Sequence, residues 1–471
     1  MRQNGIVMAE EKRKNLITEI GSKLAAERGG AMPEDPNLLT EVANLVERPT
    51  PMRGRFEERF LELPAEVLVA VMRKHQRYFP VYDGNGELLP YFIAVRNGDE
   101  KHLDVVIDGN EHVIRARFAD AEFFYNNDRQ QTLTDFIDGL ETLTFQADLG
   151  SMRDKMARLA KLTPVVAGLL DLDEAETAVA TRAASLSKAD LASSMVVEMT
   201  SLQGIMGGHY ARLSGESEAV AAAIAEQYEA VSQTRPGMAL ALADRMDSLV
   251  GLFAAGLAPK GSNDPFALRR AALQIIENVI TNEIDVDLRP GLAAAAELLP
   301  LAVGEETLTG VMAFIHGRLE GVLREEGYSA FVVKAVLAEQ AHNPYRAARA
   351  AAALTTAIAA DDWTNLLDAY ARCVRITRSQ DDTFTLRPQA FAHSAEQQLL
   401  AAYEQAAAVQ DGTIEAFVAS LRPLTPAIAH FFDEVLVMAE DTAVRENRLA
   451  LLQHIAALAA GIADFSELEG F

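Results

Sequence analysis

Arginines at helical spacing are the residues with the clearest potential for chemistry in this sequence. Arg372, Arg375 and Arg378 recur every three residues, and in a helix that spacing puts them on adjacent turns. Such a row of guanidinium groups suits the phosphates of a nucleic acid backbone, and the nearby Tyr370 could stack on a base. A solvated helix face is the alternative, because runs of charge usually form one.

A polar loop, residues 258–265, offers a second possible phosphate site. The helix after it is expected to begin at Pro265, with Asn263 or Asp264 accepting hydrogen bonds from its first N–H groups. A glycine-containing turn beside a helix start can hold an anion. A capped corner between two helices, with its charges in solvent, is the alternative. The basic residues around this loop are Lys260, Arg269 and Arg270.

Three further pairs of arginines are candidates for contact with nucleic acid. Arg115 and Arg117 follow the aromatic segment 75–79, and together they could form a pocket for a base or a phosphate. The alternative is an aromatic core edge with arginines that extend to solvent. In each of the other two pairs the residues lie about one helical turn apart: Arg346 and Arg349, and Arg445 and Arg448.

No arrangement of residues typical of a catalytic site is visible. The sequence has no glycine-rich phosphate loop before a basic residue, and no Ser-His-Asp or Cys-His set can be recognised. The single cysteine, Cys373, excludes an intrachain disulfide and fits a reducing compartment. We therefore expect no catalytic residue and no metal ligand in this chain.

The composition is that of a folded, acidic protein. Its 471 residues include 43 Lys and Arg against 68 Asp and Glu, which gives a net charge of −25 at pH 7. This charge opposes association with anionic membranes and with nucleic acid in general, although it allows local basic faces. The sequence shows no apolar run of about 18 residues and no leading signal segment. We therefore expect a cytoplasmic protein without a membrane partner.

The spacing of apolar residues predicts a mainly α fold with a small mixed α/β region at the N-terminal end. The only convincing sheet signal is a hairpin of strands 77–82 and 90–96 around Asp83-Gly-Asn-Gly86. Pro49-Thr-Pro51 is interpreted as the end of a short helix, and residues beyond 134 as almost entirely helical. The predicted parts are 1–130 (mixed α/β), 131–285 (helical), 286–355 (a helical linker) and 356–471 (a helical bundle).

Residues 242–275, LADRMDSLVGLFAAGLAPKGSNDPFALRRAALQI, closely resemble part of the β subunit of bacterial-type tetrameric glycyl-tRNA synthetase. Subunits of this family normally have a substantial further region on the N-terminal side. The resemblance therefore covers nearly all of this chain but only the C-terminal part of such a subunit. We expect this chain to lack part of the usual N-terminal region. Further matching stretches follow the family's order: KHQRYFP at 74–80, LPYFI at 89–93, RARFADAEFFY at 115–125 and LQGIMG at 202–207.

The resemblance implies a division of labour between two subunits. In this family the α subunit makes glycyl adenylate, and the β subunit recognises tRNA(Gly) and completes an α2β2 heterotetramer. The chain is thus expected to bind and position tRNA(Gly) and to associate with the α subunit. ATP and Mg²⁺ would be used by the complex, with no cofactor bound by this chain itself.

The block 131–285 resembles the HD-type helical domain, which elsewhere serves metal-dependent phosphohydrolases. That chemistry needs an adjacent His-Asp pair among the metal ligands. Here Lys188-Ala-Asp190 stands at the candidate position, and no histidine lies between residues 112 and 209. We therefore expect an HD-like scaffold without metal ligands. Two carboxylates of the pattern remain, Asp244 and Asp247.

The bundle 356–471 resembles the helical anticodon-binding domain shared with arginyl-type synthetases, with Arg445 and Arg448 at its basic positions. This resemblance favours tRNA contact by the arginines near residue 375. Two alternatives stay open. One is a non-catalytic helical scaffold, which the acidic composition favours, and the other is an HD-type metal-dependent phosphohydrolase.

Overall fold

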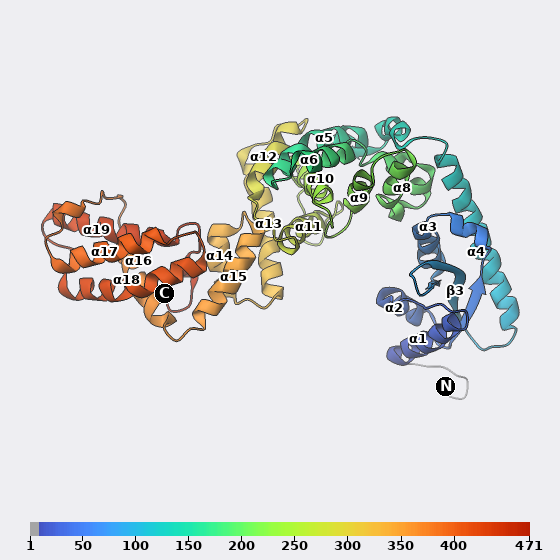
Figure 1. Ribbon diagram of the computed structural model, residues 1–471, viewed down its shortest axis with the longest axis horizontal. Helices are drawn as coiled ribbons and strands as arrows, with labels where there is room; N and C mark the ends of the chain where they lie inside the picture. The colour runs from blue at the N-terminus through green and yellow to red at the C-terminus, as the bar shows by residue number, and fades with distance from the viewer. Residues whose placement is uncertain (1–8) are drawn as a thin grey trace. The chain divides into compact units, whose positions relative to one another are not determined.

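The computed structural model describes residues 9–471, and the chain divides into two compact units that are mainly helical (Figure 1). The predicted mainly α fold with a small mixed region is therefore confirmed, whereas the predicted borders of four parts stay a prediction. Unit 1 comprises Met1–Ala160, Glu174–Glu229 and Gln233–Leu240; unit 2 comprises Lys161–Asp173, Ala230–Ser232 and Ala241–Phe471.

The helices have the following bounds. Those of unit 1 are α1 (Glu10–Ala26), α2 (Pro36–Leu45), α3 (Ala65–Ala70), α4 (Leu103–Asp128), α6 (Glu174–Ala184), α7 (Ser194–Glu198), α8 (Ile205–Leu213) and α9 (Glu218–Glu226). Two helices contribute to both units: α5 (Met152–Leu169) and α10 (Arg235–Ala254). Those of unit 2 are α11 (Leu268–Thr281), α12 (Leu288–Leu298), α13 (Glu305–Glu325), α14 (Ala330–Gln340), α15 (Pro344–Ile358), α16 (Trp363–Thr377), α17 (Ser394–Ala408), α18 (Ile414–Glu434) and α19 (Thr442–Ala456).

A three-stranded antiparallel sheet forms in unit 1, with β3 (Leu88–Asn97) between β1 (Pro49–Arg55) and β2 (Phe79–Tyr82). The predicted hairpin is confirmed: the Asp83 carboxylate accepts hydrogen bonds from the N–H groups of Asn85 and Glu87 and so closes the turn. β1 was missed because its prolines were interpreted as a helix end. An edge strand tolerates proline, because one of its sides needs no ladder partner.

A second, two-stranded sheet pairs β4 (Thr144–Gln146) with β5 (Gly150–Ser151). The expectation of a single sheet was therefore wrong. Both strands are too short for periodicity to reveal them.

The three-stranded sheet is covered by helices on both faces. On one face Ile17 of α1 and Val42 of α2 share a buried cluster with Ile93. On the other face Phe118 of α4 packs edge-on against Phe56, at 4.9 Å between ring centroids. Both faces of the sheet thus contribute residues to the core.

Buried carboxylates hold the helical part of unit 1 together. Asp128, at the end of α4, accepts hydrogen bonds from the N–H groups of Ser194 and Met195, both at 2.9 Å, and from the Tyr210 hydroxyl at 2.8 Å. Asp190 accepts from the N–H groups of Gly204 and Gly207, at 2.6 and 3.2 Å. These bonds fix the turns that connect α7 and α8.

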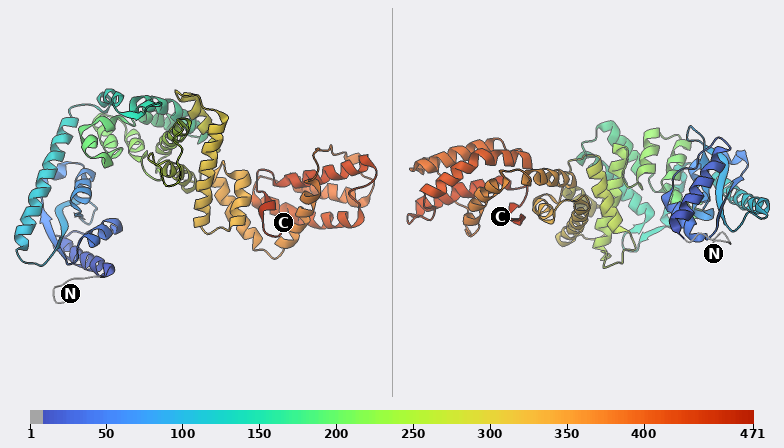
Figure 2. Two further views of the ribbon diagram at one scale, coloured as in Figure 1. Left: turned by 180° about the vertical axis from the view of Figure 1, so that it is seen from behind. Right: turned by 90° about the horizontal axis from the view of Figure 1, so that it is seen from below.

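Unit 2 ends in a bundle of α16, α17, α18 and α19, whose helices lie side by side (Figures 1 and 2). Its centre is aromatic: Phe417 of α18 stacks on Phe465 at 4.6 Å between ring centroids. The C-terminal segment returns to α14, because the Gln340 side chain donates to the Ile462 carbonyl at 2.6 Å.

Candidate nucleic-acid interface

The three arginines of α16 lie on its last two turns and just beyond. The guanidinium group of Arg372 lies over the Phe432 ring, 4.4 Å from its centroid, and that of Arg375 lies 5.7 Å from the centroid of Phe471. Arg375 and Arg378 are exposed, whereas Arg372 is half-buried. The helix turns its apolar side toward the bundle, so this end of α16 presents cationic groups to solvent.

Tyr370 does not belong to this surface, and the suggestion that it stacks on a base was wrong. Its side chain is 4% exposed, its hydroxyl donates to the Ala456 carbonyl at 2.6 Å, and its ring lies edge-on to Phe417 at 5.3 Å. Burial raises the pKa of its hydroxyl. The tyrosine is part of the bundle core, because it projects from the apolar side of α16.

Arg445 and Arg448 shape the segment between α18 and α19. Arg448 donates from Nε to Glu396 Oε1 at 2.6 Å and from a terminal nitrogen to the Leu436 carbonyl at 2.8 Å. Arg445 donates to the Ala439 carbonyl at 2.9 Å. Both guanidinium groups are thus engaged in holding this segment. Sequence reasoning missed its exposed apolar side chains, Leu436 and Met438.

Arg346 and Arg349 lie on α15 beside a cavity of about 150 Å³, which Asp285 and Asp411 also line. Arg346 forms an ion pair with Asp285 at 2.8 Å. The pKa of the Asp411 carboxyl is lowered, mainly by hydrogen bonds from Thr413 and to a smaller extent by the charge of Arg349. Carboxylates therefore share this cavity with the arginines, which makes it a poor phosphate site.

The loop before α11 is capped by its own carboxylate. Asp264 accepts hydrogen bonds from the N–H groups of Leu268 and Arg269, both at 2.9 Å. The helix begins at Leu268, so the predicted start at Pro265 was wrong: Ala267 adopts a left-handed conformation with φ 54° and interrupts the chain before it. The helix N-terminus is thus occupied by Asp264 rather than open to a phosphate.

The basic side chains around this loop divide into two kinds. Arg269 donates to the Gly261 carbonyl and so closes the loop on itself. Lys260 and Arg270 are exposed. Only the latter two present their charges fully to solvent.

Arg115 and Arg117 lie on α4, and both are exposed. Arg115 forms an ion pair with Glu57 at 2.6 Å. The aromatic segment before them belongs to the core, as the alternative interpretation held: Tyr78 stacks on Phe92 at 4.6 Å between ring centroids, and Phe79 is buried. These arginines therefore do not share a base pocket with buried Tyr78 and Phe79.

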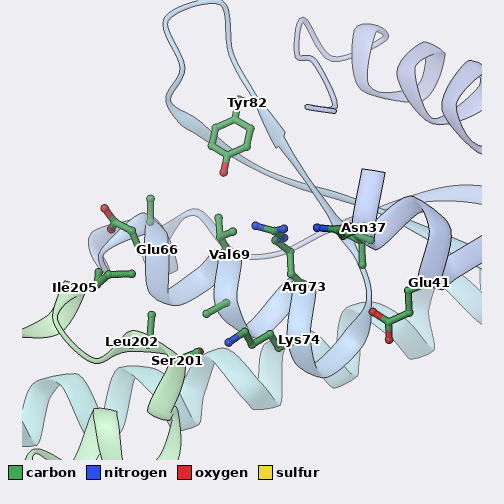
Figure 3. Close-up of a pocket in the computed structure, with 13 residues that line it drawn as sticks. Asn37, Glu41, Glu66, Val69, Arg73, Lys74, Tyr82, Ser201, Leu202 and Ile205 are labelled. Atoms are coloured by element: carbon green, nitrogen blue, oxygen red, sulfur yellow. The ribbon is translucent and has the colours of Figure 1, made fainter. Parts of the chain in front are cut away.

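A cavity of about 610 Å³ in unit 1 was not foreseen from the sequence (Figure 3). Val69, Leu202 and Ile205 contribute apolar walls, and Lys74 and Tyr82 are among the polar groups at its edge. One wall includes a π-helical turn, Val71–Gln76, a feature that often occurs at functional sites. The volume is in the range of small-molecule sites.

The Lys-Ala-Asp sequence at the HD-like position is buried. Lys188 Nζ donates to the Gln227 side chain at 2.8 Å and to the Tyr228 hydroxyl at 3.1 Å. Asp190 is fully buried, and this burial raises the pKa of its carboxyl to about 6. Within residues 9–471, no group of three or more His, Cys, Asp and Glu side chains is placed to hold a metal ion. In the same range, no helix is long and apolar enough to cross a membrane.

Comparison with known proteins gives two family matches. Residues 1–338 match the model of the glycyl-tRNA synthetase beta subunit, and residues 366–463 match the DALR anticodon binding domain. The second match contains the α16 arginines and the segment between α18 and α19.

Individual relatives agree with these matches. The chain is 41% identical over 482 residues to the glycine–tRNA ligase beta subunit of Desulforudis audaxviator, covering 99% of this chain and 70% of that protein. It is 38% identical over 477 residues to the beta subunit of Streptococcus gordonii, covering 99% and 69%. It is 42% identical over 481 residues to glycine–tRNA ligase, chloroplastic/mitochondrial 2, of Arabidopsis thaliana, covering the whole chain but 45% of that protein.

The chain thus spans less than half of the Arabidopsis protein and about 70% of the bacterial subunits. The family match covers well over half of its length, and the identities extend over nearly all of it. The chain belongs to the glycyl-tRNA synthetase beta subunit family and carries a DALR anticodon binding domain in its C-terminal bundle.

Proposed function

We propose that this chain is the tRNA-binding subunit of a glycine–tRNA ligase. It binds tRNA(Gly) and positions it for glycylation, while a separate α subunit makes the glycyl adenylate and joins it in an α2β2 complex. ATP and Mg²⁺ serve the complex, and this chain holds neither. A cytoplasmic location is part of the proposal and rests on the acidic composition and the single cysteine.

The observation that carries the proposal is the anticodon binding domain match over a bundle with exposed arginines. Arg375 and Arg378 lie within residues 366–463 and extend into solvent. Phosphate contacts by arginine supply affinity without reading sequence. A chain with a net charge of −25 needs such a local basic surface to approach RNA at all.

The contacts of the candidate residues divide them into two roles. Arg448, Arg445, Arg346, Arg115 and Arg269 bind carboxylates or carbonyls of the chain itself, so we assign them to positioning the surface. Arg372 is half-buried over the Phe432 ring, and Arg349 lines a cavity that Asp285 and Asp411 share, so we assign neither of them to direct phosphate contact. We assign direct phosphate contact to the exposed cations Arg375, Arg378, Lys260, Arg270 and Arg117.

A gel-shift titration with tRNA(Gly) and an unrelated tRNA at several salt concentrations tests the proposal. We expect preferential binding of tRNA(Gly) that weakens as salt is raised. Arg375→Ala combined with Arg378→Ala should weaken binding, and the slope of log affinity against log salt should fall by about 0.7–0.9 for each phosphate that is no longer neutralised.

A matched pair controls for the change in net charge. Arg289→Ala with Arg324→Ala removes the same charge from exposed positions of unit 2, and we expect it to leave the slope unchanged. Equal effects of the two pairs of substitutions would mean that the weaker binding comes from the change in net charge alone. Absence of binding to either tRNA by the folded wild-type chain, alone and with the α subunit, would count against the proposed function.

A further inference from the structure

Helix α4 has apolar and small residues on the side that faces solvent. Its inner side is buried through Ile114, Phe118 and Tyr125. At about 100° per residue, Val105 and Phe123 lie opposite Ile114 on the helix. We call the exposed row between them the outer stripe of α4; its residues are Val105, Gly109, His112, Ala116, Ala119 and Phe123.

An ordinary surface helix carries charged residues on its solvent side. The solvent side of α4 departs from this pattern along the outer stripe. Val105 is 64% exposed and Phe123 is 69% exposed, and Val113, 42% exposed, lies beside them. Single exposed apolar residues are common and need no explanation. Here, however, Val105 and Phe123 lie at the two ends of a row that contains no Asp, Glu, Lys or Arg. This row extends along most of a helix of 26 residues.

The spacing of the stripe is that of a helix–helix seam. Its residues follow one another at intervals of four and three, the pattern by which one helix packs along another at a shallow angle. Small side chains at Gly109, Ala116 and Ala119 allow a close approach in the middle. In Figures 1 and 2 the sheet lies on one side of α4, so its outer side is free of other elements of unit 1.

The charges beside the stripe indicate what can pack there. Asp108 and Asp120 border it on opposite sides, and for neither does the described part of the chain provide an ion pair. Of the other charges nearby, Arg115 pairs with Glu57 and Glu122 with Arg59, whereas Asp104 and Arg117 are exposed. A second copy of this chain would bring the same acidic borders and a net charge of −25, which opposes self-association.

We propose that the outer stripe of α4 is the docking surface for an amphipathic helix of the other ligase subunit, a helix whose apolar seam is bordered by Lys or Arg. The inference rests on the proposed function, because it takes the α subunit as partner. The apolar seam supplies the buried area, and the acidic borders select a basic partner and set its register.

Binding of the purified α subunit to the chain, measured by isothermal titration calorimetry, tests the docking surface. Ala116→Glu puts a charge into the middle of the seam at an exposed position, so the fold should persist in circular dichroism. We expect at least a tenfold weaker affinity. Ala178→Glu, at an exposed position of α6 in the same unit, is the matched control and should bind like the wild type.

Substitution of the two aspartates tests whether the acidic borders of the stripe contribute to binding. Asp108→Lys with Asp120→Lys should weaken binding more than the corresponding change to Asn, and the wild-type affinity should fall as salt is raised. Tighter binding by the double lysine variant would contradict a partner with basic borders. Unchanged affinity of Ala116→Glu would place the α subunit elsewhere and overturn the proposal, as would a wild-type chain that does not bind the α subunit.

Two further readouts separate this inference from the proposed function. Analytical ultracentrifugation of the chain alone detects a second copy on the stripe; self-association that Ala116→Glu abolishes would assign the surface to that copy instead. The tRNA gel shift of the wild-type chain is the second readout. A chain that binds the α subunit through the stripe but not tRNA would refute tRNA binding and leave the docking surface standing.

Discussion

At the scale of single residues, Asp190 shows how burial changes a carboxyl group. Burial is the largest influence on its pKa and raises it from 3.8 to about 6, against the hydrogen bonds from Gly204 and Gly207 and the charge of Lys188. One carboxylate oxygen accepts both backbone bonds, while the other has no hydrogen-bond partner among the described residues. The ionised form therefore costs stability at neutral pH.

The pH dependence of stability should reveal this group. Between about pH 4 and pH 6 the folded chain keeps a proton that the unfolded chain releases, so the contribution of Asp190 is complete below about pH 4 and is lost as the pH rises through about 6. Asp190→Asn removes the titration. The free energy of unfolding of the wild type, relative to Asp190→Asn, should rise by about 1 kcal/mol when the pH falls from 7 to 5.

Urea unfolding at both pH values measures this difference. Subtracting the variant from the wild type cancels the many surface carboxylates whose pKa values are lowered and whose pH dependence has the opposite sign. A difference that is equal at pH 5 and pH 7 would mean that Asp190 is ionised throughout this range.

At the scale of elements, the sequence was informative where one signal decided the structure. Asp83-Gly-Asn-Gly86 is a hairpin turn on its own, and the long helices follow from the spacing of their apolar residues. β1 was missed because Pro49 and Pro51 suppress a strand signal, and only pairing with β3 reveals it. The start of α11 was misplaced because the capping residue Asp264 lies four residues before Leu268 and the loop between them is not helical.

The sequence predicted the helical spacing of the candidate arginines but not their contacts. Arg372 and Arg375 lie in α16 as expected for adjacent turns of one helix, and Arg378 is its C-cap residue. What each arginine contacts depends on distant segments: Glu396 for Arg448, Phe432 for Arg372 and the C-terminal Phe471 for Arg375. The local sequence pattern carries no information on such long-range contacts. It also could not show that Tyr370 is buried.

The cap of α11 gives a test at this scale. Asp264→Ala leaves the N–H groups of Leu268 and Arg269 without their acceptor, and we expect the free energy of unfolding to fall by about 1 kcal/mol. Asp264→Asn retains an acceptor oxygen and should lose less. Thermal unfolding by differential scanning calorimetry compares the three chains. Equal stability of Asp264→Ala and the wild type would mean that solvent replaces the carboxylate at no cost.

At the scale of the whole molecule, acidity and RNA binding have to be reconciled. The net charge of −25 keeps nucleic acid away from most of the surface. Under the proposed function, exposed cations such as Arg375 and Arg378 determine where RNA approaches, and internally bonded residues such as Arg448 shape that surface. The same acidity favours a basic partner over a second copy, which links the charge of the chain to the proposed docking surface on α4.

The proposed division of chemistry between the two subunits can be tested by measuring each subunit alone and the two together. The proposed function assigns the activation of glycine, which requires a nucleotide site, to the α subunit. We therefore expect no glycine-dependent exchange between pyrophosphate and ATP above background with this chain alone. The α subunit should restore the exchange, and glycyl-tRNA should form only when both subunits are present. Boiled chain added to the α subunit controls for impurities, and exchange catalysed by this chain alone would contradict the assignment, because the adenylate site would then have to lie within it.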